Sequence, residues 1–377
     1  MNRWLQVAQE GQSIWLDLMS KQLIQSGEFK RLIDQDAISG ATANPTIFEQ
    51  AILKSDDYDE RIRELLDEGA DHNRIYEDLA IADIRMAADL LSNTWEMRAG
   101  SDGFISIEVS PKLAYDTKAT IDEACRFYDL VDRPNVMIKI PATEAGLPAI
   151  RHTTGHGVNV NITLIFARSR YRQVAEAYMA GLEDLAASGE KPIEAVASVA
   201  SFFVSRVDTL VDQRLDKLAE EADSDAVRQE ASDLRGKAGI ANARLAYQDF
   251  LEIFAGERFK ALVDKGAKVQ KPLWASTGVK DPAYRDTMYI EELIGPNTVN
   301  TVPPATLDAF RDHGVVRGQT ITEDIDGARK VEARLGQLGI DLEEVGTVLE
   351  REGVEKFDVS FTNLLEGIAK KRDLIRA

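Results

Sequence analysis

The stretch NVMIKIPATEAG, residues 135–146, places Lys139 in the middle of an apolar run that Pro141 ends. A short apolar run of this kind is typical of a buried strand. An amine that lies between aliphatic residues such as Ile138 and Ile140 loses its hydration, so it has to be paired or neutralised. The stretch therefore predicts a buried strand whose single charged residue has either a structural partner or a chemical role.

Similar β-rich runs alternate with helical ones along the rest of the chain. Strand–helix alternation favours a parallel sheet with right-handed crossovers, and eight candidate strands predict an α/β fold of the (β/α)8 TIM-barrel type. A doubly wound sheet is the alternative, but no glycine-rich turn follows the first candidate. The candidates are SIWLDLM (13–19), GATAN (40–44), GFISIEV (103–109), VMIKIPA (136–142), VNVNITLIF (158–166), VASVASFFV (196–204), PLWAST (272–277) and TVNTV (298–302).

Several connections are longer than a minimal barrel requires. Residues 45–100 and 205–256 each hold several helical segments, and the tail from about 320 to 377 is helical too. In the tail, apolar residues recur at three- and four-residue steps, as in Val354, Phe357, Phe361, Leu364 and Ile368. We therefore expect additional helices in the connections and one domain over residues 1–377, with the tail packed on the barrel.

Composition limits the classes of function. The 377 residues are 44% hydrophobic, and 64 acidic residues against 45 Lys and Arg give a net charge of −19. Nucleic acid and anionic membrane surfaces are poor partners for such a chain. No apolar run approaches the roughly 20 residues that span a bilayer, the start has no signal-peptide pattern, and Cys125 is the single cysteine. These features favour a cytoplasmic protein.

A metal cofactor is not expected. His152 and His156 have helical spacing, but Gly155 and Gly157 argue against a helix there, and no carboxylate lies in that stretch. A satisfied or solvated pair is the better interpretation of these histidines.

Polar residues interrupt the candidate strands with a period of two. In 158–166, for example, Val158, Val160, Ile162 and Leu164 share the aliphatic face. In a barrel the aliphatic face packs against the helices and the other face points inward, near the carboxyl ends of the strands. A structural polar network is one explanation, but buried polar groups are costly, so a set from separate strands favours a functional site. The inward-facing set is Asp17, Asn44, Glu108, Lys139, Asn161 and Thr163.

An amine among carboxylates and amides indicates covalent carbonyl chemistry. A free lysine has a pKa of about 10.4 and is a poor nucleophile at neutral pH. Desolvation can expose its lone pair, whereas nearby carboxylates act in the opposite direction. The neutral amine attacks a ketone and loses water to give an iminium, which lets a neighbouring C–C bond break. One carboxylate can serve the dehydration steps and the other the C–C cleavage.

Five motifs in this order resemble those of transaldolases. They are ATANPTIF (41–48), ISIEVSP (105–111), VMIKIPAT (136–143), NVNITLIF (159–166) and SFFVSR (201–206). The late segments KPLWASTGVKDP and NTVNTVPPATLDAF resemble a longer bacterial branch of that family. The resemblance implies a class I aldolase-type barrel without a cofactor, which transfers a dihydroxyacetone unit between sugar phosphates in the pentose phosphate pathway. It leaves the oligomeric state open and allows a homo-oligomer, because family members occur as monomers, dimers or larger rings.

The resemblance also implies roles for single residues. Lys139 would form the Schiff base, and Asp17 would deprotonate the C4 hydroxyl of the donor as the C3–C4 bond breaks. Glu108, with Thr163 positioning a water, would move protons while the Schiff base forms and hydrolyses. The remaining implied roles are in substrate binding: Asn44, Asn161 and Ser201 for the hydroxyls of the three-carbon fragment, Phe203 for the same cavity, and Arg206 and Ser276 for the phosphate.

One departure from the family pattern concerns the phosphate. The commoner pattern has an arginine two residues after the serine that matches Ser276, and here Gly278 stands at that place. Lys280 is the nearest replacement, although a solvated loop lysine is the alternative. We expect the pocket to need a second cation, given the acidic chain.

Two other functions compete with transfer. A related aldolase cleaves fructose 6-phosphate and releases free dihydroxyacetone, but that group is much shorter and typically has glutamine where Glu108 stands. A non-catalytic sugar-phosphate-binding barrel would lack at least one of Lys139, Asp17 or Glu108, and all three are present.

Overall fold

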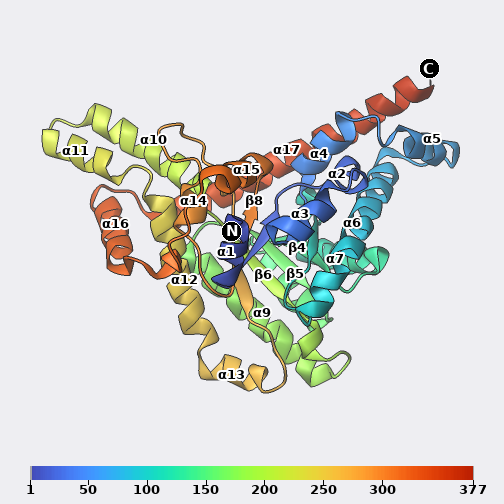
Figure 1. Ribbon diagram of the computed structural model, residues 1–377, viewed down its shortest axis with the longest axis horizontal. Helices are drawn as coiled ribbons and strands as arrows, with labels where there is room; N and C mark the ends of the chain where they lie inside the picture. Colours follow the sequence, from blue (N-terminus) through green and yellow to red (C-terminus); the bar gives the residue numbers. More distant parts are fainter. Residues whose placement is uncertain (1, 377) are drawn as a thin grey trace.

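The computed structural model describes residues 2–376, and within them eight parallel strands close into a barrel in chain order (Figure 1). The predicted (β/α)8 TIM barrel is confirmed. Closure comes from the pairing of the last strand with the first, where Trp15 lies opposite Thr301. The strands are β1 (Gln12–Leu16), β2 (Ile38–Thr42), β3 (Ile105–Glu108), β4 (Val136–Pro141), β5 (Val160–Ile165), β6 (Ser198–Phe203), β7 (Gln270–Ala275) and β8 (Thr298–Val302).

Helices surround the barrel, and several of them lengthen the connections at the places that the sequence predicts. They are α1 (Arg3–Gln9), α2 (Lys21–Gln25), α3 (Glu28–Asp36), α4 (Pro45–Leu53), α5 (Asp59–Asp67), α6 (His72–Met97), α7 (Thr117–Val131), α8 (Gly146–Gly155), α9 (Arg168–Ser188), α10 (Ser205–Glu221), α11 (Asp225–Leu234), α12 (Ala238–Phe254), α13 (Glu257–Val263), α14 (Met288–Glu291), α15 (Pro304–His313), α16 (Ile325–Gln337) and α17 (Leu342–Arg376). Short 3-10 helices cover Pro111–Leu113, Ile193–Ala195 and Thr320–Thr322. None of the described helices has the length and apolar character needed to cross a membrane.

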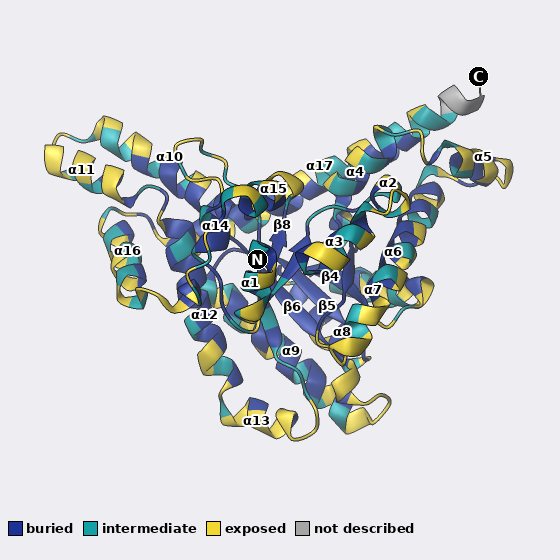
Figure 2. Cartoon of the chain, in the orientation of Figure 1, coloured by how far each residue is buried: buried dark blue, intermediate teal, exposed yellow. Residues whose placement is uncertain are grey.

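The two faces of the strands bury different groups. Figure 2 shows the strands buried and the exposed residues on the outer faces of the helices. The aliphatic face, with residues such as Ile105 and Ile107, packs against the helices in the main core. The inner face carries a second apolar cluster, to which Trp15, Met137 and Leu273 belong. The polar residues of the inner face therefore lie above an apolar floor, toward the carboxyl ends of the strands.

The end of β5 differs from the predicted alternation. Leu164 has φ +61°, and the register between β5 and β6 shifts between Ile162 and Ile165. This irregularity turns Leu164 away from the outer face, and it packs instead in the cluster that contains Phe357 of α17. A Cβ at Gly353 of α17 would lie 2.8 Å from a methyl carbon of Leu164, so the tail helix approaches this bulge closely.

Two predicted strand residues lie beyond the strand ends. Asp17 follows β1, although its N–H still donates to the carbonyl of Val302 at 2.9 Å and so continues the ladder. Asn44 follows β2 as the N-cap of α4, with its side-chain oxygen accepting from the N–H of Ile47 at 3.0 Å. Helix capping by asparagine explains why the strand prediction extended too far there.

The tail helix α17 packs on the barrel. It contacts α4, α5, α6 and β5, and Figure 1 shows it running across that side of the molecule. Leu364 and Ile368 are fully buried and belong to the main core, as their helical spacing predicts. α17 thus joins the outer helical layer to the carboxyl end of the barrel.

Candidate active site

A buried lysine and a buried glutamate form an ion pair inside the barrel. Lys139 of β4 and Glu108 of β3 are register partners, so both side chains project inward at the same level. Their side chains are 6% and 2% exposed, and Lys139 Nζ lies 3.2 Å from Glu108 Oε2. Nζ also donates to the carbonyl of Ala43 at 3.3 Å. The amine predicted from the sequence therefore has a carboxylate partner, in a place with little water.

Burial raises the pKa of the Glu108 carboxyl, although the positive charges of Lys139 and Arg206 act to lower it. Among the described residues, Glu108 Oε1 and the hydroxyl of Thr163 have no hydrogen-bond partner. Thr163 of β5 lies opposite Pro141, one inward-facing step beyond Lys139. A carboxyl with a raised pKa beside an amine is suited to accept and return a proton.

A second carboxylate lies at the mouth of the barrel. Asp17 is partly exposed and accepts a hydrogen bond from Thr42 Oγ1 at 2.7 Å. Thr42 is held in turn by Thr301 of β8, the strand on the other side of β1, at 2.8 Å. Burial raises the pKa of Asp17, while the Thr42 hydrogen bond and the charges of Lys139, Lys280 and Arg206 act to lower it. Asp17 is therefore a second group suited to proton transfer, held in place by two threonines.

A chain of hydrogen bonds crosses the interior beside the lysine. Asn161, the register partner of Lys139, donates to Ser106 Oγ at 3.0 Å and accepts from Ser201 Oγ at 2.7 Å. All three side chains are buried. The structure thus brings Asn161 and Ser201 together beside Lys139. It leaves Asn44 at the edge, where its oxygen caps α4 and only its amide nitrogen remains to meet a ligand.

Groups suited to an anion lie where β6 and β7 end. Ser205 and Ser276 hydroxyl oxygens are 2.9 Å apart, and Ser276 has φ +56°, which turns the chain at the end of β7. Arg206, in the first turn of α10, lies between two aromatic rings, with its guanidinium 5.3 Å from Phe203 and 5.8 Å from Phe357. Burial lowers the pKa of Arg206, while Asp17, Glu108 and Glu352 act to raise it. Hydroxyls and a guanidinium are donors of the kind that bind phosphate in proteins.

Lys280 lies close to the position where the sequence lacks an arginine. A Cβ at Gly278 would be 3.9 Å from Lys280 Nζ. The Lys280 side chain is exposed, and its positive charge, like that of Arg206, acts to lower the pKa of Asp17. The ammonium therefore lies on the same side of the barrel mouth as the Ser205–Ser276 pair.

No group of three or more His, Cys, Asp or Glu side chains in the described part of the chain is placed to hold a metal ion. His152 lies within α8 and His156 caps it, so the argument against a helix there was wrong. The α8 helix tolerates Gly155 because that glycine is its last residue. The two imidazole rings stack at 4.2 Å.

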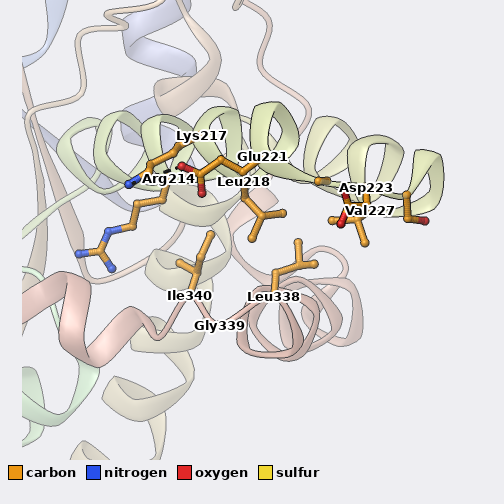
Figure 3. A pocket seen from close by; sticks show the side chains of 11 residues that line it. Arg214, Lys217, Leu218, Glu221, Asp223, Val227, Leu338, Gly339 and Ile340 are labelled. Atoms are coloured by element: carbon orange, nitrogen blue, oxygen red, sulfur yellow. Dashed lines mark ion pairs between the residues drawn. The ribbon is translucent and has the colours of Figure 1, made fainter.

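A hollow of about 600 Å³ lies away from these groups. It is formed by α10, α11 and residues 338–340 (Figure 3), where Leu218, Leu338 and Ile340 turn toward one another. It contains none of the predicted site residues.

Several contacts of the site were not predicted from the sequence. Thr42, Ser106 and Ser205 all lie inside the motifs quoted above, so their positions were a usable signal. Thr301 lies inside the late segment NTVNTVPPATLDAF, also quoted above, whereas Phe357 lies far from every quoted motif, and only the packed tail brings it to the site. The carbonyl of Ala43 is a backbone group, for which a sequence carries no signal.

A lysine and two carboxylates gathered at the carboxyl end of a (β/α)8 barrel place the molecule among the barrel enzymes. Comparison with known proteins specifies the family. Residues 14–368 match the family described as Transaldolase/Fructose-6-phosphate aldolase, and the chain belongs to that family.

Relatives named transaldolase are similar over nearly the whole chain. Transaldolase of Saccharopolyspora erythraea is 50% identical over 363 residues, which cover 96% of either chain. Transaldolase 1 of Streptomyces coelicolor is 49% identical over 367 residues, covering 97% of this chain and 94% of the relative. Transaldolase of Mycobacterium tuberculosis is 47% identical over 357 residues, covering 94% and 93%. The resemblance seen in the motifs therefore extends to the full length, including the added helices and the tail.

Proposed function

We propose that this enzyme is a transaldolase that moves a dihydroxyacetone unit from a ketose phosphate to an aldose phosphate through a Schiff base on Lys139. The donor would be sedoheptulose 7-phosphate or fructose 6-phosphate, and the acceptor glyceraldehyde 3-phosphate or erythrose 4-phosphate. The observation that supports this most is the buried Lys139–Glu108 pair at 3.2 Å, with Asp17 at the mouth above it.

In the first half-reaction, Glu108 takes a proton from the Lys139 ammonium, and the free amine attacks C2 of the donor. The carbinolamine loses its hydroxyl as water, with Glu108 returning the proton, and an iminium remains. Thr163, whose hydroxyl has no partner among the described residues, would hold that water. The same groups would serve hydrolysis in reverse.

In the second step, Asp17 takes the proton of the C4 hydroxyl, the C3–C4 bond breaks, and its electron pair moves into the iminium. The aldose leaves and the three-carbon enamine stays on Lys139. Asn161 and Ser201, which are hydrogen-bonded to each other at 2.7 Å, would hold its hydroxyls, with Asn44 at the edge. Attack on the acceptor aldehyde re-forms a C–C bond, and Asp17 returns the proton to the new hydroxyl.

The phosphate of either sugar would bind to Arg206, Ser276 and Lys280. Arg206 is held by Phe203 and Phe357 rather than by a carboxylate, since no ion pair involves it among the described residues. Its donors would therefore be available to a phosphate. Local cations of this kind would overcome the repulsion expected from a net charge of −19.

The experiment that tests the proposal is a product analysis. Purified enzyme with fructose 6-phosphate and erythrose 4-phosphate should form sedoheptulose 7-phosphate and glyceraldehyde 3-phosphate, with little free dihydroxyacetone. If fructose 6-phosphate alone yields dihydroxyacetone at a rate comparable to transfer, the enzyme is the aldolase of the same family. If neither product forms, the barrel is a binding protein. Sugar phosphates and a single cysteine are consistent with the cytoplasmic location expected from the sequence.

A further inference from the structure

Three aspartates follow one another along one face of α10, directly after the start of the helix that carries Arg206. Asp208, Asp212 and Asp216 are spaced by four residues, so their side chains lie on the same face. Asp208 is 1% and Asp212 7% exposed. We call these three residues the α10 ladder. Buried carboxylates are costly unless hydrogen-bonded, so their partners indicate what the ladder is for.

One set of partners comes from the segment between β7 and α14 together with α14 itself. Tyr284 donates its hydroxyl to Asp212 Oδ2 at 2.7 Å, and Tyr289 donates to Asp208 Oδ2 at 2.7 Å. Arg235 pairs with Asp216 and also, at 3.0 Å, with Asp281. Each aspartate of the α10 ladder therefore holds α14 or the segment that carries Lys280, either directly or through Arg235.

The other set of partners lies in the segment between α11 and α12 and in the first turn of α12. Gly239 donates its N–H to Asp208 Oδ1 at 2.7 Å, and Gly236 donates to Asp212 Oδ1 at 3.0 Å. Gly236 has φ +66°, and a Cβ there would lie 2.8 Å from the ring of Tyr284. The Tyr284 ring therefore packs directly on the backbone of Gly236, and its hydroxyl is held by Asp212. Both ends of the Tyr284 side chain are thus fixed.

Lys280 lies between two anchors of this segment. On the barrel side, Thr277 is fully buried and donates to Asn300 Oδ1 at 2.9 Å. On the other side, Asp281 and Tyr284 are held as described. Lys280, Asp281, Tyr284 and the ladder together line a hollow of about 260 Å³. The backbone of Lys280 is therefore fixed, although its side chain is exposed.

We propose that the α10 ladder, through Tyr284, positions Lys280 as the second phosphate-binding cation and thereby sets the preference for phosphorylated donors. This inference rests on the proposed function of the barrel site. A lysine is a flexible point charge that has to be brought to a phosphate, whereas an arginine has a preorganised fork. Because α10 carries Arg206 in its first turn and holds the Lys280 segment further along, one rigid helix fixes the separation of the two cations.

The variant Tyr284→Phe tests the inference, because it removes one hydroxyl and keeps the ring on Gly236. We expect the KM for fructose 6-phosphate to rise about three- to tenfold, in line with the net contribution of a single hydrogen bond. The KM and kcat for fructose, the same donor without its phosphate, should not change. A matched control is Tyr247→Phe, which removes a tyrosine hydroxyl bonded to the carbonyl of Pro296 at 3.0 Å, at the opposite end of the barrel. The control should leave both KM values unchanged.

A double-mutant cycle with Lys280→Ala separates positioning from general loosening of the fold. If Tyr284 acts through Lys280, Tyr284→Phe should have no further effect on the KM for fructose 6-phosphate once Lys280 is alanine. Additive effects of the two changes would overturn the inference, and so would equal effects on both donors. Tyr289→Phe offers a second variant should Tyr284→Phe fail to fold, and the same cycle applies to it.

Borohydride trapping with fructose 6-phosphate distinguishes the two levels of failure. If the unchanged enzyme forms a trapped adduct and Lys280→Ala raises the KM while Tyr284→Phe does not, the positioning role of the ladder is wrong and the proposed function stands. If the unchanged enzyme forms no adduct, the proposed function fails and the inference fails with it.

Discussion

At the scale of single residues, the chemistry depends on Glu108 as a carboxylate and not merely as a polar group. The variant Glu108→Gln keeps the shape but cannot take a proton from Lys139 across the 3.2 Å contact. We predict that Schiff-base formation and hydrolysis slow by about 10²- to 10⁴-fold, the usual contribution of a positioned acid–base group. Rapid-quench borohydride trapping measures the rate of formation. A control is Glu291→Gln, which alters another buried, ion-paired glutamate outside the barrel. Comparable slowing in both variants would contradict the role given to Glu108.

The inward-facing residues of the barrel were predictable because successive side chains of a strand point to opposite faces, which leaves little choice of direction for each residue. Once β3, β4 and β5 lie parallel, Glu108, Lys139 and Asn161 must point the same way, as their register shows. The hydrogen bonds among them were not predictable, because they depend on which rotamers the packed interior allows. The family resemblance added roles that the spacing of residues does not contain.

At the scale of elements, the tail helix α17 contributes to the site through Phe357, whose ring lies 5.8 Å from the guanidinium of Arg206. We predict that Phe357→Leu raises the KM for fructose 6-phosphate several-fold, because Arg206 loses one of its two flanking rings, a contact worth about 0.5–2 kcal/mol. Steady-state assays with fructose 6-phosphate and with unphosphorylated fructose measure the effect. Phe361→Leu is the matched control, since Phe361 lies on the same helix but packs on Tyr76. A similar rise in both variants would mean that the effect comes from helix packing alone.

The α10 helix makes stability depend on pH through Asp208. Burial raises the pKa of Asp208 to about 6, against 3.8 ordinarily, although its hydrogen bonds from Gly239 and Tyr289 lower it. Between these two values the folded protein holds a proton that the unfolded chain has released, so stability falls as the pH rises through this window. Summed over this pH window, the fall in the free energy of unfolding amounts to about 3 kcal/mol.

The variant Asp208→Asn should remove this contribution. We predict that the stability of the original chain relative to Asp208→Asn is greater at pH 5 than at pH 7, by about 1 kcal/mol. Urea unfolding followed by tryptophan fluorescence at the two pH values measures the difference. The same difference at both values, or a larger one at pH 7, would contradict the assignment of the shift to Asp208.

The elements themselves show where prediction from sequence ends. The alternation of apolar and polar residues located all of the barrel strands. The three- and four-residue spacing of apolar residues located the buried face of α17. The prediction failed at Leu164 and in the stretch around His152. The first failure reflects a positive φ at the end of β5, and the second a helix that extends to Gly155. Both are local backbone features that neighbouring elements stabilise, and alternation carries no signal for them.

At the scale of the whole molecule, we propose that the tail and the barrel form one folding unit. All four tryptophans lie outside α17, at positions 4, 15, 95 and 274. Leu364 of α17 is fully buried in the main core, so Leu364→Ala should cost about 2–5 kcal/mol. We predict that this change in the tail lowers the midpoint of the tryptophan transition, in step with circular dichroism. An unshifted tryptophan signal would mean that the tail unfolds by itself.

A barrel with a helical tail was predictable from the sequence, but the contact between the tail and the site was not. Sequence periodicity showed which face of α17 is buried. It did not show that Phe357 contacts Arg206, which lies 151 residues earlier in the chain. Contacts at such separation depend on the closed fold.

The central claim is that Lys139 carries the transferred unit, and the most direct measurement is reductive trapping followed by peptide mass analysis. The enzyme is incubated with fructose 6-phosphate, reduced with borohydride and digested. The peptide that contains Lys139 should gain the mass of one reduced dihydroxyacetone unit, and Lys139→Ala should gain none and have no transfer activity. A label on another lysine, or normal turnover by Lys139→Ala, would contradict the account.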